Sequence, residues 1–126
     1  MRILVVDDFM TMRRVVRGLL REIGLDDIAE AASGAAALEL LRGGSIDAVI
    51  SDIEMPTLGG FELLSAIKKD EQLRHVPVLL VTAEARKDEI LRSVQAGAAA
   101  YLVKPFTRAT LEEKLRFVLP GAFAAP

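Results

Sequence analysis

The feature that most constrains this chain is a regular alternation between two kinds of hydrophobic segment. The first kind is a short, nearly continuous apolar run rich in Val and Ile, which is typical of a strand covered on both faces. Such runs occur at Ile3–Val6, Ile28–Ala31, Ala48–Ile50, Val78–Val81 and Tyr101–Val103. A glutamate interrupts the second of these runs, which favours an edge position in the sheet.

A segment with helical spacing follows each apolar run. Between residues 12 and 23, apolar side chains recur at the i, i+3 and i+4 positions, which predicts an amphipathic helix. Ser33 is a candidate N-cap for the second helix, and Thr107 competes with Thr110 for the cap of the last one. The remaining helical segments are 34–42, 60–67, 86–96 and 111–119.

Strand followed by helix, repeated five times, predicts an α/β fold with right-handed crossovers. We expect a flavodoxin-like, doubly wound sheet of five parallel strands in the order 2-1-3-4-5, with helices on both faces. Pro120 and Gly121 end the last helical segment. We therefore expect one domain over residues 1–120 and a short, frayed C-terminal tail over residues 121–126.

Composition excludes several classes of protein. The 126 residues carry 16 Lys and Arg against 18 Asp and Glu, a formal net charge of −2, which argues against nucleic-acid and membrane-surface partners. The chain has no cysteine and one histidine, His75, so disulfide frameworks and multi-histidine metal sites are excluded. No apolar run approaches the roughly 18–20 residues of a membrane span, and the first run is too short for a signal peptide. We expect a monomeric, cytoplasmic domain.

Polar side chains follow four of the apolar runs. Asp7 and Asp8 follow the first run, and Asp52 ends the third strand. Thr82 follows the fourth run and Lys104 the fifth. Because the carboxyl ends of parallel strands lie at one edge of a sheet, we expect three carboxylates, a hydroxyl and an ammonium group to converge there.

This set of groups suits phosphoryl transfer. Neighbouring carboxylates repel one another, and a hard divalent cation such as Mg²⁺, which prefers oxygen ligands, removes that conflict. A carboxylate is also a nucleophile toward phosphorus and forms an aspartyl phosphate. Lys104 and the Thr82 hydroxyl would hold the phosphoryl oxygens. The lack of a well-placed base for water favours a long-lived phosphoryl group.

Each of these residues also has a simpler interpretation. Asp8 alone could cap the first helix, Lys104 could be an ordinary rim lysine, and Thr82 alone carries almost no signal. The functional interpretation depends on all of them falling at strand ends together.

Four short motifs together resemble the receiver domain of two-component response regulators. They are Asp7-Asp8, Asp52 with Met55-Pro56 after it, Thr82-Ala83 and Lys104-Pro105. The resemblance covers essentially the whole chain, and longer stretches resemble the single-domain chemotaxis regulators. These stretches are Asp7-Asp8-Phe9, Thr11-Met12-Arg13-Arg14, Val81 to Ala85, Val103 to Thr107 and Thr110 to Leu115.

The resemblance implies a phosphorylation mechanism. Asp52 accepts a phosphoryl group from a histidine kinase of the chemotaxis type, and Lys104 and Thr82 bind the phosphoryl oxygens. Such a domain catalyses only its own phosphorylation and dephosphorylation, so we do not expect an enzyme. The implied Mg²⁺ ligands are Asp7, Asp8, Asp52 and the backbone carbonyl of Glu54.

The resemblance also implies a switch on a distant surface. Inward movement of Thr82 makes room for the ring of Tyr101, which would otherwise be taken as a half-buried aromatic with a wet hydroxyl. The implied output partner is a protein such as the flagellar motor switch, or a phosphatase. The implied surface consists of Arg86, Lys87, Ile90, Tyr101, Val103 and Lys114.

Two other functions use the same groups. A Mg²⁺-dependent phosphohydrolase would also employ Asp52 as nucleophile, although Asp7-Asp8-Phe9 lacks the Asp-x-Asp spacing of haloacid-dehalogenase phosphatases. A receiver can instead act as a phosphate sink that passes no signal to a motor.

Two positions depart from the closest family pattern. Glu54 stands where chemotaxis regulators commonly have Asn, and Gly59 replaces an acidic residue. We expect Gly59 to loosen its loop and to remove a cap from the following helix. Glu54, with Glu84, either repels anionic phosphodonors or forms an ion pair with Arg86 or its neighbouring lysine.

Overall fold

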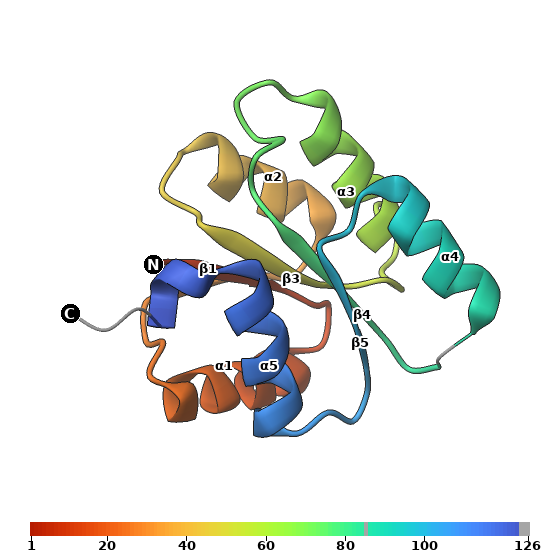
Figure 1. The fold of residues 1–126 in the computed structure, drawn as a ribbon. Helices are drawn as coiled ribbons and strands as arrows, with labels where there is room; N and C mark the ends of the chain where they lie inside the picture. The colour runs from red at the N-terminus through yellow and green to blue at the C-terminus, as the bar shows by residue number, and fades with distance from the viewer. Residues whose placement is uncertain (85, 124–126) are drawn as a thin grey trace.

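The computed structural model describes residues 1–84 and 86–123, in which five strands alternate with five α-helices (Figure 1). The strands are β1 (Ile3–Val6), β2 (Ile28–Ala31), β3 (Ala48–Asp52), β4 (Val78–Thr82) and β5 (Ala100–Val103). The helices are α1 (Met10–Ile23), α2 (Gly34–Arg42), α3 (Gly60–Lys69), α4 (Lys87–Ala96), α5 (Arg108–Val118) and the 3-10 helix η1 (Pro120–Phe123). Ala85 of the Val81 to Ala85 stretch and residues 124–126 of the predicted tail lie outside the described residues.

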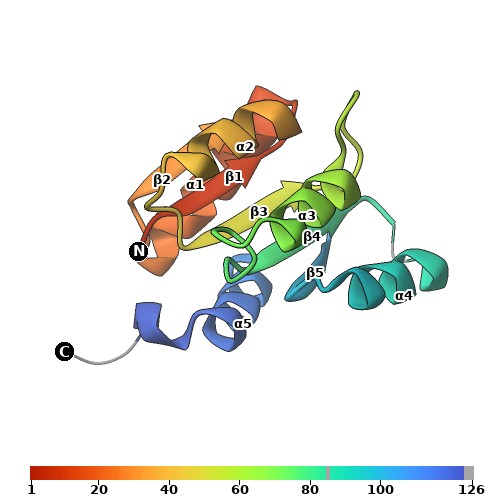
Figure 2. The same ribbon diagram turned by 90° about the horizontal axis from the view of Figure 1, so that it is seen from above.

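The strands form one parallel sheet in the order β2-β1-β3-β4-β5. In Figure 1, α2, α3 and α4 lie on one side of the sheet and α1 and α5 on the other. Figure 2 shows the strands side by side, from β2 at one edge to β5 beside α4. The predicted fold class is confirmed.

The strand side chains alternate between two apolar cores, because successive residues of a strand point to opposite faces. In β1, Leu4 and Val6 pack with residues of α2 and α3. Ile3 and Val5 pack instead with residues of α1 and α5. With a core on each face, the sheet holds the ends of its strands firmly, and the polar side chains lie at those ends.

Two central strands continue past their apolar runs to the polar residues that were predicted at their carboxyl ends. Ser51 and Asp52 stay in the ladder, paired with Leu80 and Val81, and β4 continues to Thr82. The ladder continues past polar side chains because it is made by main-chain groups. Asp52 and Thr82 are therefore positioned by the sheet itself and not by a loop.

Two predicted helix caps are confirmed. The Ser33 hydroxyl accepts a hydrogen bond from the N–H of Ala36, at the start of α2. The Thr107 hydroxyl accepts one from the N–H of Thr110, so Thr107 is the N-cap of α5. Within the described residues, none of the helices combines the length and the hydropathy needed to span a bilayer.

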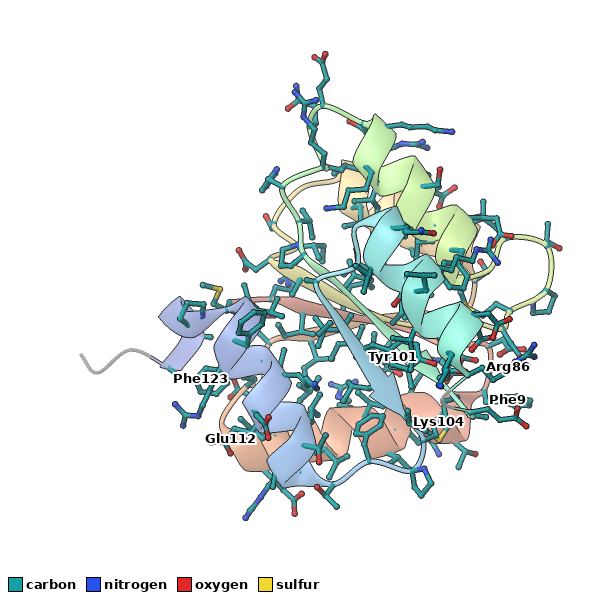
Figure 3. All side chains as sticks on the ribbon, turned by 45° about the vertical axis from the view of Figure 1, so that its right-hand side comes forward. Phe9, Arg86, Tyr101, Lys104, Glu112 and Phe123 are labelled. Atoms are coloured by element: carbon teal, nitrogen blue, oxygen red, sulfur yellow. The ribbon has the colours of Figure 1, made fainter. Side chains whose placement is uncertain are left out.

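Part of the predicted tail has a defined position beside α5. The guanidinium of Arg116 lies 4.4 Å from the ring centroid of Phe123 and pairs with Glu112 at 2.9 Å (Figure 3). The sequence predicted a frayed tail, but residues 121–123 belong to the 3-10 helix η1 and are not frayed. The division of the chain at residue 120 stays a prediction.

Candidate functional site

Three carboxylates meet at the carboxyl ends of two neighbouring strands. Asp7 and Asp8 follow β1, and Asp52 is the last residue of β3. One oxygen from each residue lies within 4.8 Å of the others. Asp7 and Asp52 are buried, with 5% and 8% of their surfaces exposed. The structure thus brings together the three acidic residues that the strand pattern predicted at this edge.

An ammonium group lies among these carboxylates. Lys104 follows β5 (Figure 3), and β4 separates β5 from β3. Its long side chain spans that distance and reaches Asp52. Its Nζ atom lies 3.2 Å from Oδ1 of Asp52 and 3.4 Å from Oδ2 of Asp7. The lysine therefore contacts two of the three acids directly.

Burial raises the pKa of Asp52 above its ordinary value, because the ionised carboxylate loses hydration. The Lys104 charge lowers this pKa, while the neighbouring charges of Asp7 and Asp8 raise it further. The net result is a raised pKa, because burial and the two neighbouring carboxylates together outweigh the charge of Lys104. Additional positive charge would stabilise the ionised form of the cluster.

Asp8 supplies a separate indication that this cluster suits a cation. Its Oδ1 atom is buried and has no hydrogen-bond partner among the described residues, and a buried oxygen in that condition is costly. The alternative that Asp8 caps α1 is wrong, because the N-cap position is Phe9, without a side-chain cap bond. Oxygen donors are the ligands that Mg²⁺ prefers, so the residues present fit this ion.

A side chain of α1 holds Asp7 in place. Nη1 of Arg13 donates to the Asp7 carbonyl at 2.8 Å, and its Nε donates to Glu30 of β2 at 3.1 Å. The Phe9 N–H donates to Oδ1 of Asp7 at 2.9 Å. The sequence indicated no role for Arg13 beyond its place in a motif. Contacts between separate helices and strands produce no regular spacing in the sequence from which they could be predicted.

The hydroxyl of Thr82 is bonded to α4. It donates to Oε1 of Glu89 at 3.1 Å and accepts from the Glu84 N–H at 3.4 Å. Thr82 is buried at the end of β4, with 3% of its surface exposed. Glu89 was not a candidate from the sequence, because no local pattern connects residues that are seven positions apart across a loop.

Tyr101 lies on the edge strand β5, and its ring packs against the core on the α4 side (Figure 3). Its hydroxyl donates to the carbonyl of Glu84 at 3.0 Å. Burial raises the pKa of Tyr101, and the negative charge of Glu89 raises it further. The hydroxyls of Thr82 and Tyr101 therefore both bond to the backbone of residue 84.

The other residues of the implied partner surface surround this edge of the sheet. They occur just before α4, on α4, on β5 and on α5, and α4 and α5 flank β5 from opposite sides (Figure 2). The members that precede or lie on α4 are exposed, and the other two are partly exposed: Arg86, Lys87 and Ile90, then Val103 and Lys114.

The loop between β3 and α3 passes close to the end of the strand. A Cβ atom on Gly59 would lie 2.8 Å from the carbonyl oxygen of Ile53, and one on Gly60 would lie 2.5 Å from that of Asp52. Glycine therefore permits close packing at this point. That Gly59 also loosens the loop stays a prediction. The loss of a side-chain cap at the start of α3 is confirmed.

Two exposed glutamates flank the acidic cluster in the sequence, Glu54 after β3 and Glu84 after β4. Arg86 pairs with Asp88 at 3.2 Å, so the alternative that Arg86 neutralises Glu54 is contradicted. Glu54 lies in the same loop as Gly59 and shares a shallow cavity with Glu62. Both features leave the loop after Asp52 with negative charge toward solvent.

Comparison with known proteins identifies the family. The family model for the response regulator receiver domain matches residues 3–116. Chemotaxis protein CheY-3 of Vibrio cholerae is 51% identical over 115 residues, which cover 91% of this chain and 88% of that protein. Chemotaxis protein CheY of Pseudomonas aeruginosa is 50% identical over 115 residues, with coverage of 91% and 93%.

Solved structures give the same result. Vibrio cholerae CheY4, crystallised at pH 4.0, has a TM-score of 0.86 at 34% identity and covers 94% of this chain and 98% of its own. A response regulator receiver domain protein from Clostridium thermocellum has a TM-score of 0.86 at 31% identity, with coverage of 97% and 96%. The chain therefore belongs to the response regulator receiver domain family of two-component signalling. Within that family it is similar to the chemotaxis response regulators.

Proposed function

We propose that the chain is a phosphorylation-activated response regulator of a chemotaxis-type two-component pathway, in which Asp52 accepts a phosphoryl group from a histidine kinase. The main support is the 3.2 Å contact between Lys104 and Asp52 inside a cluster of three carboxylates. Positioning and charge neutralisation supply most of the catalysis in phosphoryl transfer, and these contacts provide both.

In the transfer step, a carboxylate oxygen of Asp52 attacks the phosphorus of the kinase phosphohistidine. The O–P bond forms while the N–P bond breaks, and the electron pair of that bond returns to the imidazole nitrogen. Lys104 binds one phosphoryl oxygen, and no protein base is needed because the nucleophile is already ionised. When bound, Mg²⁺ supplies positive charge against the phosphoryl oxygens. The groups that would hold this ion are the side chains of Asp7, Asp8 and Asp52 and the backbone carbonyl of Glu54.

The phosphoryl group changes the surface around β5 through Thr82 and Tyr101. It adds nearly two negative charges at neutral pH, which attract the Thr82 hydroxyl. Residue 84, whose backbone bonds to both hydroxyls, links that movement to Tyr101. The altered surface binds an output protein in the cytoplasm, either the flagellar motor switch or a phosphatase, through Arg86, Lys87, Ile90, Tyr101, Val103 and Lys114.

Phosphotransfer from a phosphorylated chemotaxis-type kinase tests the proposal. We expect one phosphoryl group per chain, dependent on Mg²⁺ and lost in Asp52→Asn. The matched control is Asp26→Asn, which removes an exposed carboxylate from the turn before β2 and should incorporate phosphate at the normal level. Incorporation that survives Asp52→Asn would move the acceptor to another residue and contradict the proposal.

Turnover separates this function from its alternatives. A stoichiometric, metal-dependent acyl phosphate supports a signalling role, whereas repeated hydrolysis of small phosphate esters would favour a phosphohydrolase. Capture of the motor switch protein by the beryllofluoride-bound chain, and not by the free chain, would separate motor output from a phosphate sink.

A further inference from the structure

The Thr82 hydroxyl is already occupied in the unphosphorylated chain. A threonine hydroxyl has a single proton to donate, and here it goes to Oε1 of Glu89 at 3.1 Å. The acceptor side of the hydroxyl is used as well, by the Glu84 N–H at 3.4 Å. Thr82 therefore cannot donate to a phosphoryl oxygen and to Glu89 at the same time.

Glu89 is placed to compete well for that proton. It lies in the first turn of α4 and is half-buried. Its carboxylate accepts the hydrogen bond from the Thr82 hydroxyl. Hydrogen bonds to a charged acceptor are about twice as strong as neutral ones. The other acid of that turn, Asp88, is instead paired with Arg86, which precedes α4.

We propose that Glu89 is a positioning residue that holds the Thr82 hydroxyl on α4 and competes with the phosphoryl group for its single proton. This inference rests on the proposed function of Asp52 and Thr82, and it names the part of α4 that opposes activation. When Thr82 turns to the phosphoryl group, Glu89 loses its partner. The start of α4 therefore differs in its contacts between the two states.

The released carboxylate also lies beside the tyrosine of the switch. The charge of Glu89 is the second largest cause of the raised pKa of Tyr101, after burial, and Asp88 contributes less. Because the same carboxylate faces both hydroxyls, a change at Thr82 is felt at Tyr101 without any movement of the sheet. Glu89 thus connects the strand end to the edge of the partner surface.

Two simpler roles for Glu89 predict different results. An acid in the first turn of a helix also stabilises the helix N-terminus, and any negative charge near the site repels a phosphoryl group. Asp88 shares the first role and the sign of charge but does not contact Thr82, so Asp88→Asn is the matched control. Glu89→Gln keeps the size of the side chain and removes its charge.

The first test is the Mg²⁺-dependent affinity of the chain for beryllofluoride, which imitates the phosphoryl group on Asp52. We expect Glu89→Gln to bind about fivefold tighter than the original chain, the difference between a charged and a neutral acceptor. Asp88→Asn should change the affinity by less than about twofold. In a Thr82→Val background, which lacks the hydroxyl, Glu89→Gln should have no effect.

The outcomes separate this inference from the function on which it rests. If the original chain does not bind beryllofluoride, the proposed function fails and the inference falls with it. If it binds but Glu89→Gln binds no tighter, Glu89 does not compete for the Thr82 proton, and only the inference is overturned. If the gain persists in Thr82→Val, Glu89 acts by charge alone, and again only the inference is overturned.

A second measurement needs no phosphoryl analogue. Tyr101 is the only tyrosine and the chain has no tryptophan, so ultraviolet titration of the phenol reports on this one residue. We expect Glu89→Gln to lower the pKa of Tyr101, and Asp88→Asn to lower it less. An unchanged phenol titration in Glu89→Gln would show that the carboxylate does not face this edge, and would overturn the link from Glu89 to Tyr101.

Discussion

The acidic cluster and the region around Thr82 differ in how well their polar groups are satisfied. In the acidic cluster, three carboxylates share one lysine and an oxygen of Asp8 has no partner among the described residues. Around Thr82, its hydroxyl and that of Tyr101 each donate to an acceptor. The first region is completed by binding, whereas the second must break bonds in order to change.

Under the proposed function, this difference describes a protein with two states. A ligand shifts an equilibrium only by the difference in its affinity for the two states. Binding at the incomplete region supplies that free energy, and the bonds around Thr82 set the amount required. Substitutions in the two regions should therefore have opposite effects, lowering the response in the first and raising it in the second.

The largest effect is expected from removing the ammonium group of the acidic cluster. Lys104→Met should slow phosphotransfer to Asp52 by about 10²–10³-fold, because one preorganised charge at a transferring group contributes that much. Rapid-quench kinetics with a phosphorylated kinase measure the rate. Lys69→Met, which removes an exposed ammonium group from α3, serves as control and should transfer at the normal rate. A similar rate in both variants would mean that Lys104 only fills space.

In the absence of Mg²⁺, the acidic cluster should also lower the free energy of unfolding. Asp52→Asn removes the ionised carboxylate from a buried position, and we expect it to raise the free energy of unfolding by about 1 kcal/mol without Mg²⁺. With Mg²⁺ the order should reverse, since an ion that binds only the folded chain stabilises the chain with more ligands. Urea denaturation in chelator and in Mg²⁺ measures both.

The difference in free energy of unfolding between Asp52→Asn and the original chain should depend on pH, because the pKa of Asp52 is raised. The folded chain binds the proton more tightly than the unfolded chain, so stability falls as pH rises between the ordinary pKa of 3.8 and the higher folded pKa. The cost is absent below the ordinary pKa and complete above the folded one. The advantage of Asp52→Asn should therefore vanish in acid; an advantage that persists there would contradict this cause.

The two regions also differ in how far the sequence predicts them. The sequence predicts that Asp7, Asp8 and Asp52 lie together, because the carboxyl ends of parallel strands lie at one edge of a sheet. The acceptor of the Thr82 hydroxyl depends on the side-chain conformation of Glu89 and on the path of the loop before α4. Neither leaves a periodic pattern, so the sequence contains no local signal for that contact.

The close packing at Gly59 was also not predictable from the sequence. Glycine is commonly associated with freedom of the backbone, yet its value here is the space that its missing Cβ leaves against Ile53. Whether a glycine loosens or tightens a loop depends on which segment passes beside it. That information appears only once the chain has folded.

A smaller effect is expected at the hydroxyl of Tyr101. Tyr101→Phe removes the bond to the Glu84 carbonyl and should lower the free energy of unfolding by about 1 kcal/mol. Urea midpoints with an unchanged m-value measure the difference. Because this bond belongs to the satisfied region, its loss should not weaken Mg²⁺ binding. A loss of Mg²⁺ affinity in this variant would mean that the two regions are not separable.

The smallest effect concerns the charge at the entrance to the acidic cluster. Glu54 is exposed in the loop after Asp52, so an approaching anionic phosphodonor meets its charge before it meets Lys104. Glu54→Asn should raise the rate of phosphorylation by acetyl phosphate about twofold at low salt, the size of a typical exposed charge interaction. Higher salt should reduce the gain, because ions screen exposed charges. Glu22→Gln removes an exposed acid from α1 and should leave the rate unchanged. If Glu54→Asn and the original chain react equally fast at low salt, the negative loop does not repel donors, and access to the cluster is governed by Lys104 and the bound cation alone.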